Sequence, residues 1–327
     1  MTIKWGIIGL GNIAHQFIQD LQLVKNTACH AVASRTVDKA RDFANKYEVP
    51  KAYGSYAELL ADPQVDIVYI ATPHNFHFEH TINALRAGKH VLCEKPFAVN
   101  AKQVREMIAT AVKQRRFLME AFWTRFNPSF EYCLELVENG ALGVVNYINA
   151  DFTFFRNDPP ESRMLNMDYA GGSLLELGVY PLFLAYMLLG KPTEVKAVAH
   201  FHETGADLQV GILLKSEQGI ANLFSGFQSQ SDMVAKIYGT KGRMYLQPYW
   251  HETQGYELVI GNDGVYKTEK AQLPTRGKGF TYEIEECLQC IRADQLESSK
   301  WSHQNSLELT SLTDTVREQI GLKYPFE

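Results

Sequence analysis

Residues 3–14, IKWGIIGLGNIA, decide the fold expected for the first third of this 327-residue chain. A short apolar run, predicted to be a strand, leads directly into the pattern G-x-G-x-x-A. In this pattern the first glycine permits a tight turn, the second lets the backbone approach a pyrophosphate, and the small last residue lets the next helix pack close to the sheet. The first helical turn offers N–H groups and a positive dipole to the phosphates. The stretch therefore predicts that a dinucleotide binds at this turn, through Gly9, Gly11, Asn12 and Ile13.

Strand and helix patterns alternate from this turn to about residue 120. The apolar runs are continuous, which is typical of strands buried on both faces of a parallel sheet. We therefore predict an α/β architecture whose N-terminal domain, residues 1–122, is a doubly wound parallel sheet of the Rossmann type. Strands are expected at 3–10, 30–34, 65–72, 90–93 and 116–122, and helices at 12–24, 37–47, 78–88 and 100–115.

The hydrophobic pattern changes from about residue 144, where apolar and polar residues begin to alternate, as in EVKAVAHF at 194–201. Such alternation marks antiparallel strands with one buried face. Helices are expected at about 174–189, 280–293 and 305–321. We predict a C-terminal α+β domain, residues 123–327, with a large, mostly antiparallel open sheet. Helices on one face leave the other free, so we expect a homodimer, or a dimer of dimers, through that face.

Composition narrows the classes of partner. The formal net charge of −5 argues against nucleic acid or an anionic membrane as the main partner. No apolar run reaches the roughly 18 residues that span a bilayer, and the N-terminus lacks a signal-peptide pattern. The five cysteines are odd in number, and Cys287 and Cys290 have no second Cys or His pair at zinc spacing. We expect a cytoplasmic protein with reduced thiols, no metal and a small-molecule partner.

The end of the second strand bears on the choice of cofactor. A site that prefers NAD usually places Asp or Glu there to bind the ribose 2′-hydroxyl, but residues 33–36 read ASRT. Arg35, with Lys39 one helical turn later, could hold a 2′-phosphate, because a guanidinium group matches phosphate geometry. The alternative is that both are solvated surface charges. We predict NADP rather than NAD, bound here by Ser34, Arg35 and Lys39.

ATPHNFHFEH, residues 71–80, follows the third strand at the carboxyl edge, where ligands lie in such folds. Thr72, Pro73, Asn75 and His77 are candidates for contacts with the cofactor. His77 and His80 have an alternative role, in which they cap or pack the following helix.

HVLCEKPFAVN, residues 90–100, follows the fourth strand at the same edge. Proline ends the strand because it has no N–H to donate. Lys95 is then either a solvated loop charge or, with Glu94 beside it, a group aimed at the cofactor cleft.

GGSLLELGVYPLF, residues 171–183, places Glu176 and Tyr180 at i and i+4 on one face of a predicted helix. A tyrosine can act as general acid–base in alcohol oxidation when a nearby ammonium group stabilises its phenolate. The alternative is that Tyr180 is part of the core, because the same helix is rich in leucine and valine.

Together, GLGNIA, ATPHNFHFEH, CEKPF, MEAFWTRFNP and GGSLLELGVYP resemble the Gfo/Idh/MocA oxidoreductases, and the resemblance extends over essentially the whole chain. It is strongest to a branch that oxidises trans-dihydrodiols and D-xylose with NADP. The resemblance implies that Lys95 is the catalytic lysine, that the Lys95–Pro96 bond is cis, and that Tyr180 is the acid–base. Many members have histidine at the position of Tyr180, and the branch has aspartate where this chain has Glu176.

The resemblance also implies roles for the ligand-facing residues. Substrate would lie against Trp123, Phe152, Glu176 and Trp250, and Arg125 would lie near the nicotinamide half of the cofactor. The implied reaction is hydride transfer between NADP and a secondary alcohol or cyclic hemiacetal of a sugar or trans-dihydrodiol. The alternatives are an NAD-dependent inositol or other sugar dehydrogenase of the same family, and a non-enzymatic dinucleotide-binding regulator.

Overall fold

The computed structural model describes residues 2–262 and 264–327, which divide into two compact units. The first contains the chain up to Phe126 together with Arg276–Leu307, and the second contains Asn127–Thr275 and Glu308–Glu327. This division differs from the predicted one, 1–122 and 123–327, chiefly because residues 276–307 belong to the first unit. Helix α9 (His303–Ile320) crosses the division.

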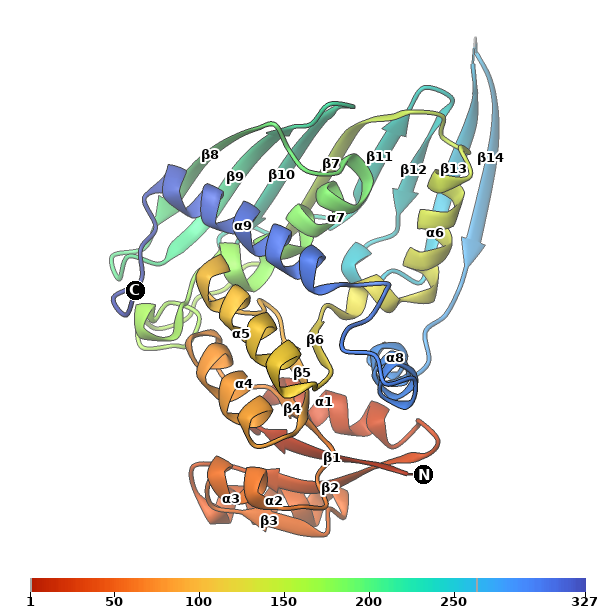
Figure 1. The fold of residues 1–327 in the computed structure, drawn as a ribbon. Helices are drawn as coiled ribbons and strands as arrows, with labels where there is room; N and C mark the ends of the chain where they lie inside the picture. Colours follow the sequence, from red (N-terminus) through yellow and green to blue (C-terminus); the bar gives the residue numbers. More distant parts are fainter. Residues whose placement is uncertain (1, 263) are drawn as a thin grey trace. The chain divides into compact units, whose positions relative to one another are not determined.

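Within the described part of the chain, six parallel strands form the sheet of the first unit, in the order β3-β2-β1-β4-β5-β6 (Figure 1). This is the order of a doubly wound dinucleotide fold, with the topological switch between β1 and β4. The strands are β1 (Ile3–Ile8), β2 (Thr27–Ala33), β3 (Lys51–Tyr53), β4 (Ile67–Ile70), β5 (His90–Glu94) and β6 (Leu118–Ala121). The helices are α1 (Asn12–Leu21), α2 (Val37–Tyr47), α3 (Tyr56–Ala61), α4 (His77–Arg86), α5 (Ala101–Gln114) and α8 (Thr281–Arg292).

The predicted fold class is confirmed, and the differences are local. β3 and α3 were not predicted, because a three-residue strand with no buried residue and a six-residue helix carry little hydrophobic periodicity. The start of α3 does have a sequence signal, since Ser55 and Glu58 form a capping box. α1 ends at Leu21 instead of the expected Val24.

Hydrogen bonds connect the segment 276–307 to the rest of the first unit, and no local sequence pattern predicts them. The Asp20 carboxylate of α1 accepts from the backbone N–H groups of Lys278 and Phe280 at 2.8–2.9 Å. The backbone N–H of Leu118 donates to the Leu296 carbonyl at 3.0 Å. These partners lie far apart in the chain, so their contact could not be predicted from the sequence.

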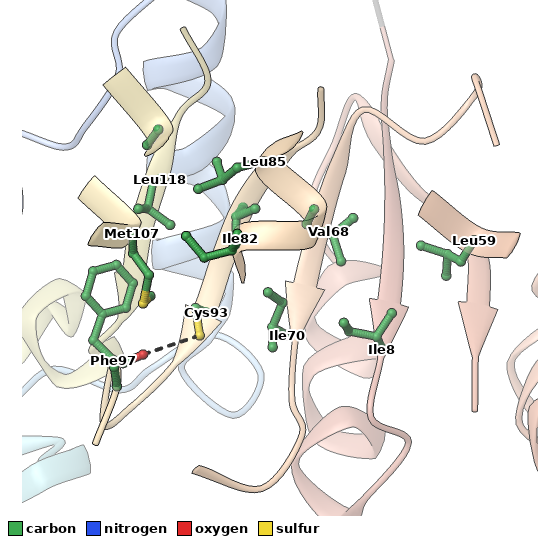
Figure 2. Close-up of a cluster of buried hydrophobic side chains, with 14 of the residues drawn as sticks. Ile8, Leu59, Val68, Ile70, Ile82, Leu85, Cys93, Phe97, Met107 and Leu118 are labelled. Carbon is green, nitrogen blue, oxygen red and sulfur yellow. Dashed lines mark hydrogen bonds between the residues drawn. The ribbon is translucent and has the colours of Figure 1, made fainter. Parts of the chain in front are cut away.

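A buried hydrophobic cluster lies under α4 and α5 and extends along the sheet from β2 to β6 (Figure 2). Its members include Ile8, Val68, Ile70, Cys93 and Phe97, all completely buried. Phe97 follows the Lys95–Pro96 pair by one residue, so the core anchors the chain directly after the lysine. Burying a side chain of this size contributes about 1.5–3 kcal/mol to folding.

Among the described residues of the second unit, eight strands form a sheet in the order β14-β13-β12-β11-β7-β10-β9-β8, and only β7 and β10 pair in parallel (Figure 1). Figure 1 shows α6, α7 and α9 on one face of this sheet. The strands are β7 (Val145–Thr153), β8 (Glu194–Phe201), β9 (Asp207–Lys215), β10 (Ile220–Gly226), β11 (Ala235–Gly239), β12 (Gly242–Leu246), β13 (Gly255–Asn262) and β14 (Val265–Gln272). The helices are α6 (Pro128–Glu138) and α7 (Val179–Leu189).

The predicted helix 174–189 does not run as one α-helix. Leu174–Gly178 forms a single π-helical stretch, called the π-turn below, and α7 begins at Val179. Residues 167–189 have the length and hydropathy of a membrane span, but 78% of the apolar window is buried in the protein. This segment is therefore interpreted as a core helix.

Candidate functional site

The glycine turn after β1 has the geometry that a pyrophosphate needs. Gly9 has φ +85°, and a Cβ there would lie 2.5 Å from the carbonyl carbon of Ala71. Gly11 is the N-cap of α1, and a Cβ there would meet nothing within 4 Å. No side chain of the described residues caps this helix, whose first residues, Asn12 and Ile13, are exposed and half-buried. The open space and the uncapped N–H groups form a site for an anion.

The loop after β4 lies at the same edge of the sheet, because β4 is the parallel neighbour of β1. Thr72 is buried, with its hydroxyl 3.0 Å from Nδ1 of His80, and Pro73 leads into a short 3₁₀ turn. The Asn75 Oδ1 atom is buried and has no hydrogen-bond partner among the described residues. A buried acceptor without a partner costs free energy, so this atom fits a donor supplied by a ligand.

His77 has a different role from the predicted contact with the cofactor. Its ring is completely buried, with Nδ1 2.8 Å from the Pro96 carbonyl oxygen and Nε2 2.9 Å from that of Thr72. Burial lowers the pKa of His77 to about 3, so the ring is neutral and donates to one of the two carbonyls. His77 therefore braces the loops after β4 and β5 against each other, which corrects its assignment as a ligand residue.

The end of β2 has an exposed cationic corner. Arg35 and Lys39 are exposed, whereas Ser34 is buried and donates its backbone N–H to the Tyr53 carbonyl at 3.3 Å. The nearby acid Asp38 forms an ion pair with Arg41 at 3.7 Å. Burial lowers the pKa of His15, and the nearby positive charges of Lys46 and Lys39 lower it further.

Lys95 follows β5, at the same sheet edge as the glycine turn. Its side chain is half-buried, and its bond to Pro96 is cis, as the family resemblance implied. The segment is fixed after the lysine by Phe97, whose ring lies in the core and whose carbonyl accepts from the Cys93 thiol at 3.8 Å (Figure 2). The structure thus places Lys95 on an anchored loop.

Two buried carboxyl groups hold this loop. Glu94 accepts from the Tyr69 hydroxyl and, at 3.1 Å, from the Lys95 backbone N–H. Glu120 accepts from the Phe97 N–H and from the Trp301 indole N–H, both at 3.0 Å. Burial raises the pKa of Glu120 to about 7, and its hydrogen bonds and the charge of Lys95 oppose that rise.

Sequence reasoning missed Glu120, although a signal was present. It is the one acidic residue within the predicted strand 116–122, RFLMEAF, where an unpaired carboxylate would be costly.

Trp123 and Arg125 lie in a 3₁₀ turn, Trp123–Phe126, after β6. The Trp123 ring stacks on Phe280 with centroids 5.0 Å apart, and Arg125 donates from Nε to the Lys300 carbonyl at 3.0 Å. Both are thus positioned by the segment 276–307.

An aromatic cluster surrounds Tyr180 in the second unit. The Phe152 ring centroid is 5.3 Å from that of Tyr180 and 4.1 Å from that of His251, which stacks on it. His251 is also 5.4 Å from Tyr180. All three side chains are buried. Phe152 and Tyr180 were predicted site residues, and His251 was not.

Trp250 does not fit the predicted place in a substrate pocket. Its side chain is completely buried, and its indole N–H donates to the Asp151 carbonyl at 2.7 Å. The turn Trp250–Glu252 instead directs the next residue, His251, toward Phe152 and Tyr180. Trp250 and His251 are thus neighbours in the chain with different surroundings, since Trp250 lies in the core and His251 contacts the rings of Phe152 and Tyr180.

Glu176 is paired within the protein. Its carboxylate accepts from both terminal nitrogens of Arg163, at 3.1 and 3.0 Å. A bidentate pair fixes the carboxylate geometry and neutralises its charge.

The predicted residues therefore form two groups. In the first unit, the glycine turn, the loop at 72–75 and Lys95 follow adjacent parallel strands and share one sheet edge. In the second unit, Phe152 and Tyr180 are in ring contact, and Glu176 lies on the π-turn that leads to Tyr180.

Comparison with known families gives two matches. The oxidoreductase family with an NAD-binding Rossmann fold matches residues 3–122, and the GFO/IDH/MocA C-terminal domain matches residues 130–245. The chain is 37% identical to trans-1,2-dihydrobenzene-1,2-diol dehydrogenase of Mus musculus and 36% identical to that of Homo sapiens. Each alignment covers 99% of both chains.

Solved structures show the same fold. A 3-ketoreductase from Actinomadura kijaniata, crystallised with NADP and TDP-benzene, has a TM-score of 0.88 and 28% identity over 98% of both chains. An aldose-aldose oxidoreductase from Caulobacter crescentus, crystallised with glycerol, has a TM-score of 0.87 and 27% identity. That alignment covers 98% of this chain and 97% of the other.

Proposed function

This chain belongs to the Gfo/Idh/MocA family of oxidoreductases, and we propose that it is an NADP-dependent dehydrogenase of secondary alcohols. Its substrate would be a trans-dihydrodiol or the cyclic hemiacetal of a sugar. The observation that supports this most is the position of Lys95, half-buried and anchored at the sheet edge that also presents the phosphate-binding turn.

The residues at the sheet edge fit a dinucleotide. Gly9 and Gly11 would admit the pyrophosphate, and the orphaned Asn75 oxygen would receive a donor. Arg35 and Lys39 would hold a 2′-phosphate, which favours NADP. NADP is also the cofactor crystallised with the Actinomadura ketoreductase. When bound, it would supply the hydride-accepting nicotinamide ring.

The protein's own part in the reaction would be proton handling and orientation. Tyr180 would take the proton of the substrate hydroxyl, and the ammonium group of Lys95 would stabilise the resulting phenolate. Phe152 and His251 would hold the Tyr180 ring, since both are in ring contact with it. Aromatic walls suit the flat face of a dihydrodiol or the apolar face of a sugar.

The relatives support a substrate that bears hydroxyl groups. The mouse and human relatives are named for a benzene dihydrodiol, and the Caulobacter relative for aldoses. The paired state of Glu176 and Arg163 favours an uncharged substrate, because neither charge needs a counter-charge from a ligand.

A turnover assay tests this function. NADP⁺ reduction is measured with a panel of diols, aldoses and inositols. Lys95→Ala and Tyr180→Phe should each lower kcat by about a hundredfold while NADPH still binds. The exposed residues Lys102 and Tyr266 provide matched controls, Lys102→Ala and Tyr266→Phe, which should leave kcat unchanged. A wild-type kcat in either site variant would refute the assignment of that residue.

An NAD-dependent inositol or sugar dehydrogenase is the second candidate. The substitution Arg35→Asp separates the two, because it replaces the proposed 2′-phosphate ligand with a ribose-binding carboxylate. The kcat/KM for NADP should fall by about a hundredfold while that for NAD is kept or rises. A chain that already prefers NAD would support the second candidate.

We also propose that the protein is cytoplasmic and a homodimer, joined through the open face of the eight-stranded sheet. Apolar side chains on strands of that sheet support the dimer, since Val198 and Leu213 are 74% and 47% exposed. Light scattering of wild type and of Val198→Asp tests it, and a monomeric wild type would exclude it.

A further inference from the structure

The π-turn Leu174–Gly178 lies directly before the helix that carries Tyr180. π-helical turns are rare, and they are found frequently at functional sites. One extra residue in a turn rotates the side chains that follow by about 100°. The π-turn therefore sets the direction of Tyr180, and whatever holds the π-turn also holds the tyrosine.

Asp207, the first residue of β9, holds the beginning of the π-turn. Its side chain is completely buried, and Oδ2 accepts from the Leu174 backbone N–H at 2.7 Å and from the Ser173 hydroxyl at 2.9 Å. Gly172 has φ +129°, and a Cβ there would lie 2.0 Å from Oδ1 of Asp207. The second glycine of the GG pair is thus required by the approach of this carboxyl group.

Ser225 of β10 contacts both ends of the same turn. Its hydroxyl oxygen lies 3.1 Å from that of Ser173. A Cβ at Gly178, the last residue of the turn, would lie 3.0 Å from the same oxygen. Ser225 thus fixes how closely the π-turn approaches the sheet.

Tyr324, near the end of the chain, supports the loop before the turn. It is buried, its ring lies 4.7 Å from the guanidinium carbon of Arg317, and its hydroxyl donates to the Gly171 carbonyl at 3.5 Å. Burial raises the pKa of Tyr324 well above its usual value, and the charge of Asp207 raises it further. The hydroxyl is therefore protonated and able to donate.

We propose that Asp207 is a positioning residue for the reaction, which acts by fixing the π-turn and thereby the orientation of Tyr180. The proposal rests on the proposed role of Tyr180 as acid–base. Asp207 belongs to none of the motifs that identify the site, and the Leu174 backbone carries its effect to the tyrosine. A small displacement of a catalytic group costs up to about a hundredfold in rate, so the expected effect lies in kcat.

The test is a double-mutant cycle between Asp207 and Tyr180. Asp207→Ala should lower kcat about thirtyfold in the wild-type background, with little change in NADPH affinity. In the Tyr180→Phe background the same change should lower the residual kcat less than threefold, because no tyrosine remains to be positioned. Asp207→Asn keeps an acceptor for the Leu174 N–H and should recover most of the activity. Asp168→Asn, at an exposed acid in the same unit, is the control.

Each outcome of the double-mutant cycle either supports or refutes the positioning role of Asp207. Equal losses in both backgrounds would show a general structural role and overturn the proposal, as would full activity of Asp207→Ala. If Tyr180→Phe itself keeps wild-type kcat, the assignment of Tyr180 as acid–base is refuted, and the positioning role of Asp207 is refuted with it. If Asp207→Ala does not fold, the cycle is run with Ser173→Ala, which removes one of the two bonds to the carboxyl group. The same non-additivity is then expected, and additive losses refute the proposal.

Discussion

Replacing Asp20 should release the segment 276–307 from the first unit without unfolding the sheet. The carboxylate accepts from the backbone N–H groups of Lys278 and Phe280, and its side chain is buried. A hydrogen bond to a charged group contributes about 1.5–3 kcal/mol. Asp20→Ala removes the acceptor from both amides, whereas Asp20→Asn keeps one acceptor oxygen.

Hydrogen exchange measures this effect directly, because the two amides are themselves the donors. A loss of about 1.5–3 kcal/mol at each amide corresponds to exchange roughly 10- to 150-fold faster, at about 1.4 kcal/mol per factor of ten. Asp20→Ala should show this acceleration at Lys278 and Phe280, and Asp20→Asn should show a smaller one. Amides of β1 and β4 should be unaffected, because local opening leaves the sheet intact.

Asp42→Ala, at an exposed acid on α2, is the matched control and should leave both amides protected. Protection of Lys278 and Phe280 that is unchanged in Asp20→Ala would refute the reasoning. So would a uniform loss of protection throughout the first unit, since this would show global destabilisation instead of local release.

Three further predictions concern the site. Gly9→Ala should weaken NADPH binding at least tenfold in a fluorescence titration, because its Cβ would clash with backbone; Gly140→Ala, also at positive φ but facing open space, should not. His251→Ala should raise KM severalfold because it removes a ring next to Tyr180, whereas Trp250→Phe should lower the thermal midpoint and leave KM unchanged; the reverse pattern would show that Trp250, and not His251, lies against the substrate. The pKa of Glu120 in the folded protein is about 7, above its usual value of 4.5. Between pH 4.5 and 7 the folded protein therefore keeps the Glu120 proton that the unfolded chain has lost. The contribution of Glu120 to the free energy of unfolding thus falls as the pH rises from about 4.5 to 7. Glu120→Gln should flatten that part of the stability profile, by up to about 3 kcal/mol, in urea denaturation at a series of pH values, and an unchanged profile would contradict the raised pKa.

Features of the fold that have local causes could be predicted from the amino-acid sequence. The glycine turn, the continuous apolar strands and the intervening helices predicted a doubly wound sheet, because each depends on residues close together in the chain. The position of Lys95 at the carboxyl edge of the sheet could also be predicted, since parallel strands end at a common edge. The missing carboxylate after the second strand also predicted Arg35 and Lys39 as ligands of a 2′-phosphate, which stays a prediction.

Features that depend on partners distant in the chain could be identified only in the folded protein. Asp20 and Phe280 are 260 residues apart, and Glu120 and Trp301 are 181 apart, so no periodicity connects them. Hydrophobic periodicity in the sequence also could not distinguish Trp250, whose side chain is buried in the core, from His251, whose ring contacts that of Tyr180. The π-turn looks helical in sequence, and the Asp207 carboxyl group, which accepts from its first backbone N–H, lies on a strand that follows it. Side-chain type and spacing thus determined which residues stand at the sheet edge, whereas burial and long-range hydrogen bonds decided which of them are held in place and by what.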